Sequence, residues 1–254
     1  MSRFPLRTTL SVLLLWLSVL LAGCSTTPQY QGPVLPAQKP VSEFVKPDQK
    51  YFIQVYDPLE RFNRNVYYFN ANFDRYVFLP VVDTYQWITP DLVEQGVSNF
   101  FKNIDDITNL LNAMLQLKPE QSGQILARLV FNSTIGILGL WDPATAMGIP
   151  RHQEDFGQTL GYYGLGPGPF LVLPILGPSN LRDTAGLVVD FGALNAIDPL
   201  QLNNHQEREL IYSLMRAIDQ RRNVDFRYYK TGSPFEYDLV RVIYTRYREL
   251  RIAK

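Results

Sequence analysis

The stretch Phe156–Leu181, FGQTLGYYGLGPGPFLVLPILGPSNL, is the part of the chain that decides the fold. It contains no charged residue, and prolines at positions 167, 169, 174 and 178 exclude a helix through the whole of it. A membrane-spanning helix needs about 20 unbroken apolar residues, and a long exposed loop normally carries charges. Irregular uncharged backbone is tolerated at membrane depth only where it is buried in protein or lines a cavity. The stretch therefore predicts either a non-helical segment at a bilayer or a buried, glycine-rich connection in a globular core.

The N-terminus has the composition of an export signal. Arg3 and Arg7 precede an apolar run over residues 10–21, and the small residues Ala22 and Gly23 follow. This order is typical of a secretory signal peptide, and the run is too short to act as a stable transmembrane anchor. We therefore expect residues 1–23 to be a signal peptide.

Cys24 is the only cysteine of the chain, so it has no disulfide partner within it. Leu21-Ala22-Gly23-Cys24 resembles a bacterial lipobox, which implies cleavage before Cys24 and covalent acyl and diacylglyceryl groups on that residue. The alternative is a plain signal peptide that ends near a cysteine. Ser25 stands where lipoproteins of the inner membrane typically carry Asp, so the resemblance points to the periplasmic side of the outer membrane of a Gram-negative bacterium. Repeated prolines over residues 24–50 predict a flexible, lipidated tether.

Amphipathic helices are expected after the tether. Asp57-Pro58-Leu59-Glu60 has the pattern of a helix start with a capping box, and apolar residues then recur every three or four positions until Pro80, where we expect the helix to end. Further helices are expected from Thr89-Pro90-Asp91, from near Asp105, from Pro119 to about Leu138, from Arg182, and over 204–223 and 235–251. No alternating strand pattern stands out, so the predicted fold is all-α.

The helix expected after Pro119 is unusual in its charge. Between Gln121 and Pro150 the only charged residues are Arg128 and Asp142. A helix with one face in water normally carries a charged stripe. The segment is therefore either buried at the centre of the domain or faces an apolar environment.

Composition and motifs argue against nucleic-acid binding and catalysis. The formal net charge is +0, whereas a nucleic-acid-binding protein normally shows a basic excess or stripe. His152 and His205 are far apart in sequence and form neither a metal-binding helix motif nor a recognisable triad. Neither a G-x-S-x-G elbow nor a phosphate-binding glycine loop is present. We predict no enzyme and no metal or other cofactor.

Several motifs occur together in one order: Asp57-Pro58-Leu59-Glu60-x-Phe62-Asn63-Arg64, Ser98-Asn99-Phe100, Asn132-Ser133-Thr134-Ile135-Gly136, a glycine-rich segment from Phe156 to Pro169, Leu173-Pro174 and Leu181-Arg182-Asp183. With the lipobox they resemble the MlaA (VacJ) family of outer-membrane lipoproteins over about residues 57–190. The resemblance implies a ring-like assembly of amphipathic helices in the inner leaflet of the outer membrane, with an irregular Gly/Pro-rich hairpin segment. It also implies removal of mislocalised phospholipid from the outer leaflet, association with a trimeric porin, and delivery to the periplasmic lipid carrier MlaC.

The resemblance and the sequence together give candidate site residues. Gly164-Leu165-Gly166 resembles a hairpin loop that lies by the channel in the family and affects its state, and we predict that it is the gate. Asn63, Asn70 and Asn72 could line a polar passage without adding net charge, or they are simply the solvated face of their helix. Phe69, with Asn70, is a further candidate for the channel.

Three functions therefore stay open at this stage. The first is a phospholipid-translocating lipoprotein, which maintains outer-membrane lipid asymmetry. The second is a structural lipoprotein that scaffolds a porin or envelope complex without moving lipid. The third is a membrane-bound lipid hydrolase that uses His152 or His205. We divide the chain into a signal peptide (1–23), a tether (24–50), a helical membrane domain (51–232) and a charged C-terminal helix (233–254).

Overall fold

The computed structural model describes residues 55–202, 205–230 and 233–253. Contacts within the chain group it into two units, Met1–Lys50 and Tyr51–Lys254, and all described residues belong to the second. The predicted signal peptide, the lipidation site Cys24 and the tether lie outside the described residues.

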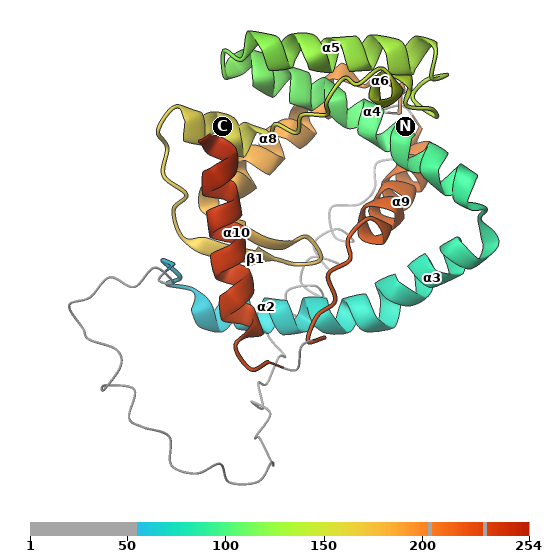
Figure 1. Ribbon diagram of the computed structural model, residues 1–254. Helices are drawn as coiled ribbons and strands as arrows, with labels where there is room; N and C mark the ends of the chain where they lie inside the picture. Colours follow the sequence, from blue (N-terminus) through green and yellow to red (C-terminus); the bar gives the residue numbers. More distant parts are fainter. Residues whose placement is uncertain (1–54, 203–204, 231–232, 254) are drawn as a thin grey trace, which may run out of the picture. The chain divides into compact units, whose positions relative to one another are not determined.

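The described unit is built mainly from helices, as predicted (Figure 1). The elements in chain order are α2 (Glu60–Phe73), the π-helical turn η2 (Asp74–Phe78), α3 (Leu79–Ile88), α4 (Asp91–Leu115), α5 (Pro119–Thr134), α6 (Pro143–Ala146), α7 (Phe156–Tyr162), β1 (Phe170–Leu173), β2 (Gly177–Asn180), α8 (Leu181–Ile197), α9 (Gln206–Arg222) and α10 (Glu236–Ile252).

Contacts between these elements form a closed circuit. Helix α2 contacts β1, β2 contacts α8, and α8 contacts α4. Helix α4 contacts α9, and α9 contacts α3, which continues α2 through η2. Figure 1 shows the resulting ring of helices within this unit, with α5 packed on the outer side of α4. The expectation of a ring-like assembly of helices is confirmed.

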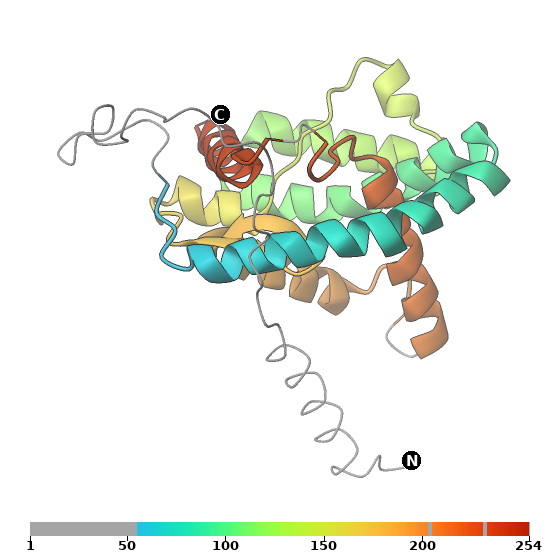
Figure 2. The same cartoon turned by 90° about the horizontal axis from the view of Figure 1, so that it is seen from below.

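The helix does not end at Pro80, so that prediction was wrong. Pro80 lies in the first turn of α3, a position that its fixed φ angle suits. The π-helical turn η2 joins α2 to α3, and Figure 2 shows the three elements as one continuous rod. A π-helical turn changes the local hydrogen-bond register, which lets a helix continue past a proline.

Asp105 does not start a helix, because α4 runs without a break from Asp91 to Leu115. The sequence pattern misled here because Asp105 pairs with Arg216 of α9 instead of capping a helix end. Helix α5 ends at Thr134, slightly before the predicted end near Leu138. Ile137 and Leu138 have positive φ angles of 52° and 57°, which are incompatible with a continuing right-handed helix.

Asp57 is not a helix cap either. The residue before α2 is Leu59, and no side chain caps the helix there. The Asp57 carboxylate instead accepts hydrogen bonds from Asn63, Tyr237 and Arg241. It therefore joins the start of α2 to α10.

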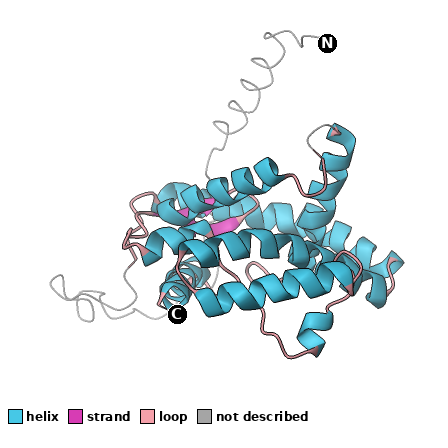
Figure 3. Ribbon diagram, turned by 90° about the horizontal axis from the view of Figure 1, so that it is seen from above, coloured by secondary structure: helices cyan, strands magenta, loops and turns pink. Residues whose placement is uncertain are grey.

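A short antiparallel hairpin lies among the helices (Figure 3). The family resemblance implied a hairpin in the Gly/Pro-rich segment, but the residue pattern alone did not indicate its strands. Phe170 is opposite Asn180 and Leu173 is opposite Gly177, so residues 174–176 make the turn. Strands of four residues with prolines nearby show too little alternation to be recognised. The uncharged stretch is thus helical at its start, irregular in the middle and hairpin at its end.

Polar residues are buried and apolar residues exposed to an unusual degree. Asn63, Asp106, Gln116 and Gln158 are among the most buried side chains of the unit. Large apolar side chains are exposed along α3, α4, α5 and α8, with Trp87 exposed to 85 %. Monomeric soluble proteins rarely expose apolar surface of this extent. Within residues 55–202, 205–230 and 233–253, every helix is too short or too polar to cross a bilayer.

Candidate functional site

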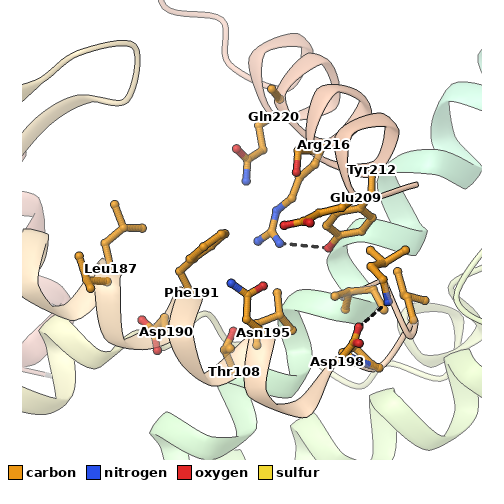
Figure 4. A pocket seen from close by; sticks show the side chains of 18 of the residues that line it. Thr108, Leu187, Asp190, Phe191, Asn195, Asp198, Glu209, Tyr212, Arg216 and Gln220 are labelled. Atoms are coloured by element: carbon orange, nitrogen blue, oxygen red, sulfur yellow. Dashed lines mark hydrogen bonds between the residues drawn. The ribbon is translucent and has the colours of Figure 1, made fainter. Parts of the chain in front are cut away.

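A pocket of about 500 Å³ lies between α4, α8, α9 and the hairpin turn. Figure 4 shows its lining side chains, with α8 and α9 as facing walls. The α8 wall is mainly apolar and includes Leu187, Val188, Phe191 and Leu194. The α9 wall is mainly polar and includes Glu209, Tyr212, Ser213, Arg216 and Gln220. The pocket is therefore amphipathic, with one apolar and one polar side.

Arg216 is the main cation of the α9 wall. Its guanidinium donates to Asp105 of α4 at 2.6 Å and to the Tyr212 hydroxyl at 3.1 Å. Burial raises the pKa of Asp105 above its ordinary value, because the effect of burial is larger than the opposing effect of the charges of Arg216 and Arg151. The Arg216 side chain thus lies at the pocket wall in a fixed orientation, paired with the partly buried Asp105.

Ion pairs fix α9 at the pocket. Arg221 binds Asp74 of η2 through two nitrogens, with one contact of 2.8 Å. Arg222 donates to Glu94 of α4 at 2.7 Å. Because Asp74 and Glu94 are buried, these bonds satisfy carboxylates that would otherwise be costly inside the protein. Arg221 and Arg222 thus hold this helix in the ring.

Helix α8 is fixed by its cap and by a close glycine contact. The Asn180 side chain accepts from the Asp183 backbone N–H, which caps the helix. A Cβ atom at Gly186 would lie 2.2 Å from the backbone nitrogen of Gly157, so only glycine allows α7 and α8 to pack this closely. This packing places the apolar face of α8 toward α9.

Helix α10 is attached to α7 and α8 by a shared arginine. Arg248 donates to both oxygens of Asp155, at 2.6 and 2.7 Å, and to Asp183 at 2.7 Å. Burial acts to raise the pKa of Asp155, but hydrogen bonding and charge from Arg248 lower it below its ordinary value. Asp183 also accepts from Arg182 and from the Tyr244 hydroxyl. The network attaches α10 to the start of α7 and to the first turn of α8.

Two of the predicted channel residues hold the hairpin instead. Asn63, which is fully buried, donates to the Phe170 carbonyl and accepts from the Val172 N–H. Asn70 donates to the Leu173 carbonyl and accepts from the Ile175 N–H. Each amide thereby replaces a strand partner along the free edge of β1. We assign Asn63 and Asn70 to hairpin attachment, which corrects the expectation that they line a passage.

Asn72 and Phe69 lie elsewhere on α2. The Asn72 amide donates to the Tyr68 carbonyl of its own helix. Phe69 is half-exposed and stacks on Phe73 with ring centroids 6.0 Å apart. Neither residue lines the pocket between α8 and α9, and their role in a channel stays a prediction.

Gly164, Leu165 and Gly166 follow α7, at the end of the hairpin away from its turn. The hairpin turn is formed by residues 174–176, with Leu176 lining the pocket, so the loop at Gly164–Gly166 is not the hairpin turn. Gly164 has a φ of +88°, and no atom lies within 4 Å of a Cβ built there. The loop is exposed, and its role as a gate stays a prediction.

The pocket residues on α9 were missed from sequence. The apolar stripe of α8, including Leu187, Phe191 and Leu194, was recognisable from its spacing. Nothing in the sequence shows that Arg216 meets Asp105, because the two are separated by 111 residues. His152 contacts Gln124 of α5 and does not line the pocket, which gives no geometric support to a hydrolase.

The fold and the pocket define a helical ring with an apolar exterior and an amphipathic interior. A family model described as MlaA lipoprotein matches residues 55–251. The chain belongs to this family.

Relatives and a solved structure agree with this membership. The chain is 38 % identical over 169 residues to an uncharacterised protein of Rickettsia conorii, in a match that spans 66 % of each chain. It is 38 % identical to the intermembrane phospholipid transport system lipoprotein MlaA of Escherichia coli (strain K12), over 53 % of this chain and 55 % of that one. A solved structure reported as the structural basis for maintenance of bacterial outer membrane lipid asymmetry matches with a TM-score of 0.66 and 29 % identity, over 78 % of this chain and 100 % of that one.

Proposed function

We propose that this protein moves phospholipid within the bacterial cell envelope, by passing it through the amphipathic pocket between α8 and α9. It takes mislocalised phospholipid from the outer leaflet of the outer membrane and maintains lipid asymmetry. The proposal agrees with the transport role named for its Escherichia coli relative and with the subject of the matching structure.

The observation that carries the proposal is the two-sided lining of the pocket. A phospholipid must keep its charged head group among polar partners while its acyl chains stay in an apolar environment, since an unpaired buried charge is very costly. Arg216 and Gln220 supply polar partners on one wall, and Phe191 and Leu194 supply apolar surface on the other. No covalent chemistry is needed for this task, so the proposed function includes no enzymatic step.

The exposed apolar side chains support a location inside one leaflet. Trp87 and Ile88 of α3 and Leu126 and Val130 of α5 would contact acyl chains of the inner leaflet of the outer membrane. Acyl groups on Cys24 would anchor the same chain from the periplasmic side. A trimeric porin and the periplasmic carrier MlaC are the partners expected by resemblance to the family.

The alternative function is a lipoprotein scaffold for a porin or envelope complex. A scaffold accounts for the exposed apolar surface equally well, but it does not require an amphipathic pocket. The two functions are separated by measuring phospholipid in the outer leaflet of a strain that lacks the gene.

In that strain, we expect phospholipid to accumulate at the cell surface and the wild-type gene to clear it. Cys24→Ala, which removes the predicted lipidation site, is expected to leave the accumulation uncorrected. If deletion leaves surface phospholipid unchanged, the transport proposal fails and the scaffold takes its place.

The proposed gate has its own test. Gly164→Pro cannot keep the φ of +88° and is expected to alter lipid transport, with protein level and anchoring retained. Gly148→Pro is the matched control, because Gly148 also has a positive φ, of +78°, and open space around it but lies outside this loop. Transport unchanged by Gly164→Pro would contradict the gate.

A further inference from the structure

A second, charged pocket adjoins the amphipathic one. It has a volume of about 260 Å³ and lies between α4, α7, α8 and α10. Both pockets are lined by Thr108, Leu187, Asp190 and Arg216. Arg216 from α9 and Asp190 from α8 stand on facing walls at this boundary (Figure 4). A molecule bound across it would meet apolar surface on one side and charged groups on the other.

Most cations of the charged pocket are already paired. Arg248 binds Asp155 and Asp183, and Arg216 binds Asp105. Arg151 lies 3.7 Å from Asp106.

Arg251 is different. Its guanidinium donates to the Tyr247 hydroxyl at 3.0 Å and lies over the Tyr247 ring at 5.7 Å. In the part of the chain that the structure describes, it makes no ion pair. One cation of this pocket is therefore left for a ligand.

One carboxylate of the charged pocket, that of Asp190, forms no ion pair within the described residues. Asp105 and Asp155 bind arginines, and Glu154 accepts from Lys118 at 3.2 Å. Among the described residues, Asp190 accepts hydrogen bonds from two neutral groups, the Asn112 amide at 2.7 Å and the Phe156 N–H at 2.8 Å, and Arg248 acts on it through its charge without forming an ion pair. Burial raises its pKa above the ordinary value, more than these hydrogen bonds lower it. A cationic ligand group would supply the missing charge.

Resting on the proposed function, we infer that the charged pocket binds the zwitterionic head group of an ethanolamine phospholipid, with its phosphate at Arg251 and its ammonium at Asp190. The acyl chains extend past Leu187 and Phe191 into the amphipathic pocket. Guanidinium groups bind phosphate through charge-assisted hydrogen bonds. The primary ammonium of an ethanolamine head group donates charge-assisted hydrogen bonds to a carboxylate. The hydroxyls of a glycerol head group can also donate hydrogen bonds, but they carry no charge. The pocket thus favours ethanolamine over glycerol phospholipid.

The test uses the full chain in detergent micelles, titrated with fluorescent short-chain phosphatidylethanolamine and phosphatidylglycerol. The wild type is expected to bind the ethanolamine lipid about fivefold to tenfold more tightly, because one charge-assisted hydrogen bond distinguishes the two. Asp190→Asn should weaken ethanolamine binding about tenfold and leave glycerol binding unchanged, which abolishes the preference. Arg251→Gln should weaken both lipids by a similar factor, because both carry the phosphate.

Two matched variants control for nonspecific charge effects. Arg246→Gln removes a partly exposed arginine of the same helix, α10, and Asp83→Asn removes an exposed carboxylate of α3. Neither residue lines either of these two pockets, and neither change should alter lipid binding. Arg251 lies in the last turn of α10, so its variant tests the inference even if Asp190→Asn disturbs the start of α7.

The outcomes separate this inference from the transport proposal. Equal affinity of the wild type for both lipids, unaltered by Asp190→Asn and Arg251→Gln, overturns the head-group site and leaves transport standing. If neither lipid binds, the head-group site and the transport proposal are both overturned.

Discussion

Helices α10 and α3 differ in what they bury. Helix α10 buries Glu236 and Tyr237 and places Arg241 and Arg248 against carboxylates of other elements. Helix α3 buries Val82 and exposes apolar side chains, with Trp87 the most exposed among them. In a soluble protein the apolar face would be inside and the charges outside.

The difference shows how the ring is held together. Apolar side chains gain little from helix packing when the alternative is contact with lipid, since acyl chains are as apolar as they are. Hydrogen bonds and ion pairs then do most to fix the helices against one another. In the membrane location that we propose, the polar seams of α9 and α10 and the apolar surfaces of α3 and α5 would be two consequences of one environment.

The largest expected effect comes from breaking the seam at Arg248. Arg248→Leu removes one of the two arginines that pair with Asp183, whose side chain is exposed to 6 %, and it removes both hydrogen bonds to Asp155. We expect a loss of about 3 kcal/mol in the free energy of unfolding, measured by denaturant unfolding in detergent. The exposed pair of Arg246 and Glu249 is the control, and Arg246→Leu should cost less than about 0.5 kcal/mol. Equal losses in the two variants would contradict the role of the seam.

A somewhat smaller loss is expected where α7 crosses α8. Gly186→Ala places a Cβ 2.2 Å from the backbone nitrogen of Gly157. The clash is with backbone, which cannot move aside as the end of a flexible side chain can. We expect a loss of about 2 kcal/mol in the free energy of unfolding. Gly192→Ala lies on the same helix with open space around it and should stabilise slightly, because alanine favours helix. Tolerance of alanine at Gly186 would show that the two helices are not packed this closely.

The attachment of the hairpin to α2 provides the third test. Asn63→Ala removes the two hydrogen bonds that the Asn63 amide donates, to Asp57 and to the Phe170 carbonyl, and the one that it accepts from the Val172 N–H. The Val172 N–H is left without this partner. The expected loss is about 2 kcal/mol in the free energy of unfolding. Asn72→Ala, on the same helix, removes one exposed bond to its own backbone and should change the unfolding free energy by less than about 0.5 kcal/mol. If Asn63 lined a solvated passage instead, both variants would behave alike.

The smallest effect on stability is expected on the apolar surface. Trp87→Lys replaces a side chain exposed to 85 %, so unfolding in detergent should change by less than about 0.5 kcal/mol. Binding to phospholipid vesicles should weaken, because a charge replaces an aromatic side chain at the membrane surface. Trp87→Phe is the control and should retain vesicle binding. Unchanged vesicle binding of Trp87→Lys would place α3 away from the lipid.

The sequence predicted the elements that depend on local patterns. The helical fold, the amphipathic stripe of α8 and the two charged C-terminal helices follow from spacing and composition. The continuation of the helix past Pro80 was not predictable. A proline in the first turn of a helix and a proline that ends a helix look alike in sequence, and the π-helical turn η2 that joins α2 to α3 is visible only in the structure. The hairpin strands are too short to show a period.

Residues that act at long range were the hardest to predict. Asn63 has the polarity of a solvated or channel-lining residue, and only its contact with β1 shows a structural role. The charged residues of α9 and α10 have the pattern of solvated helix faces, yet Arg221 and Arg248 pair with buried or partly buried carboxylates far away in sequence. In this protein a polar residue on a helix therefore gives no reliable sign of which side faces water.

Lipid transfer through the pocket between α8 and α9 is tested most directly by filling it. Ser213 lines the pocket and is exposed, whereas the neighbouring Leu214 is exposed outside it. The measurement is the transfer of fluorescent phospholipid between vesicles and an acceptor by the reconstituted full chain. Ser213→Trp is expected to reduce transfer to the rate seen without protein, while Leu214→Trp transfers like the wild type. Normal transfer by a stably folded Ser213→Trp variant would contradict passage through this pocket.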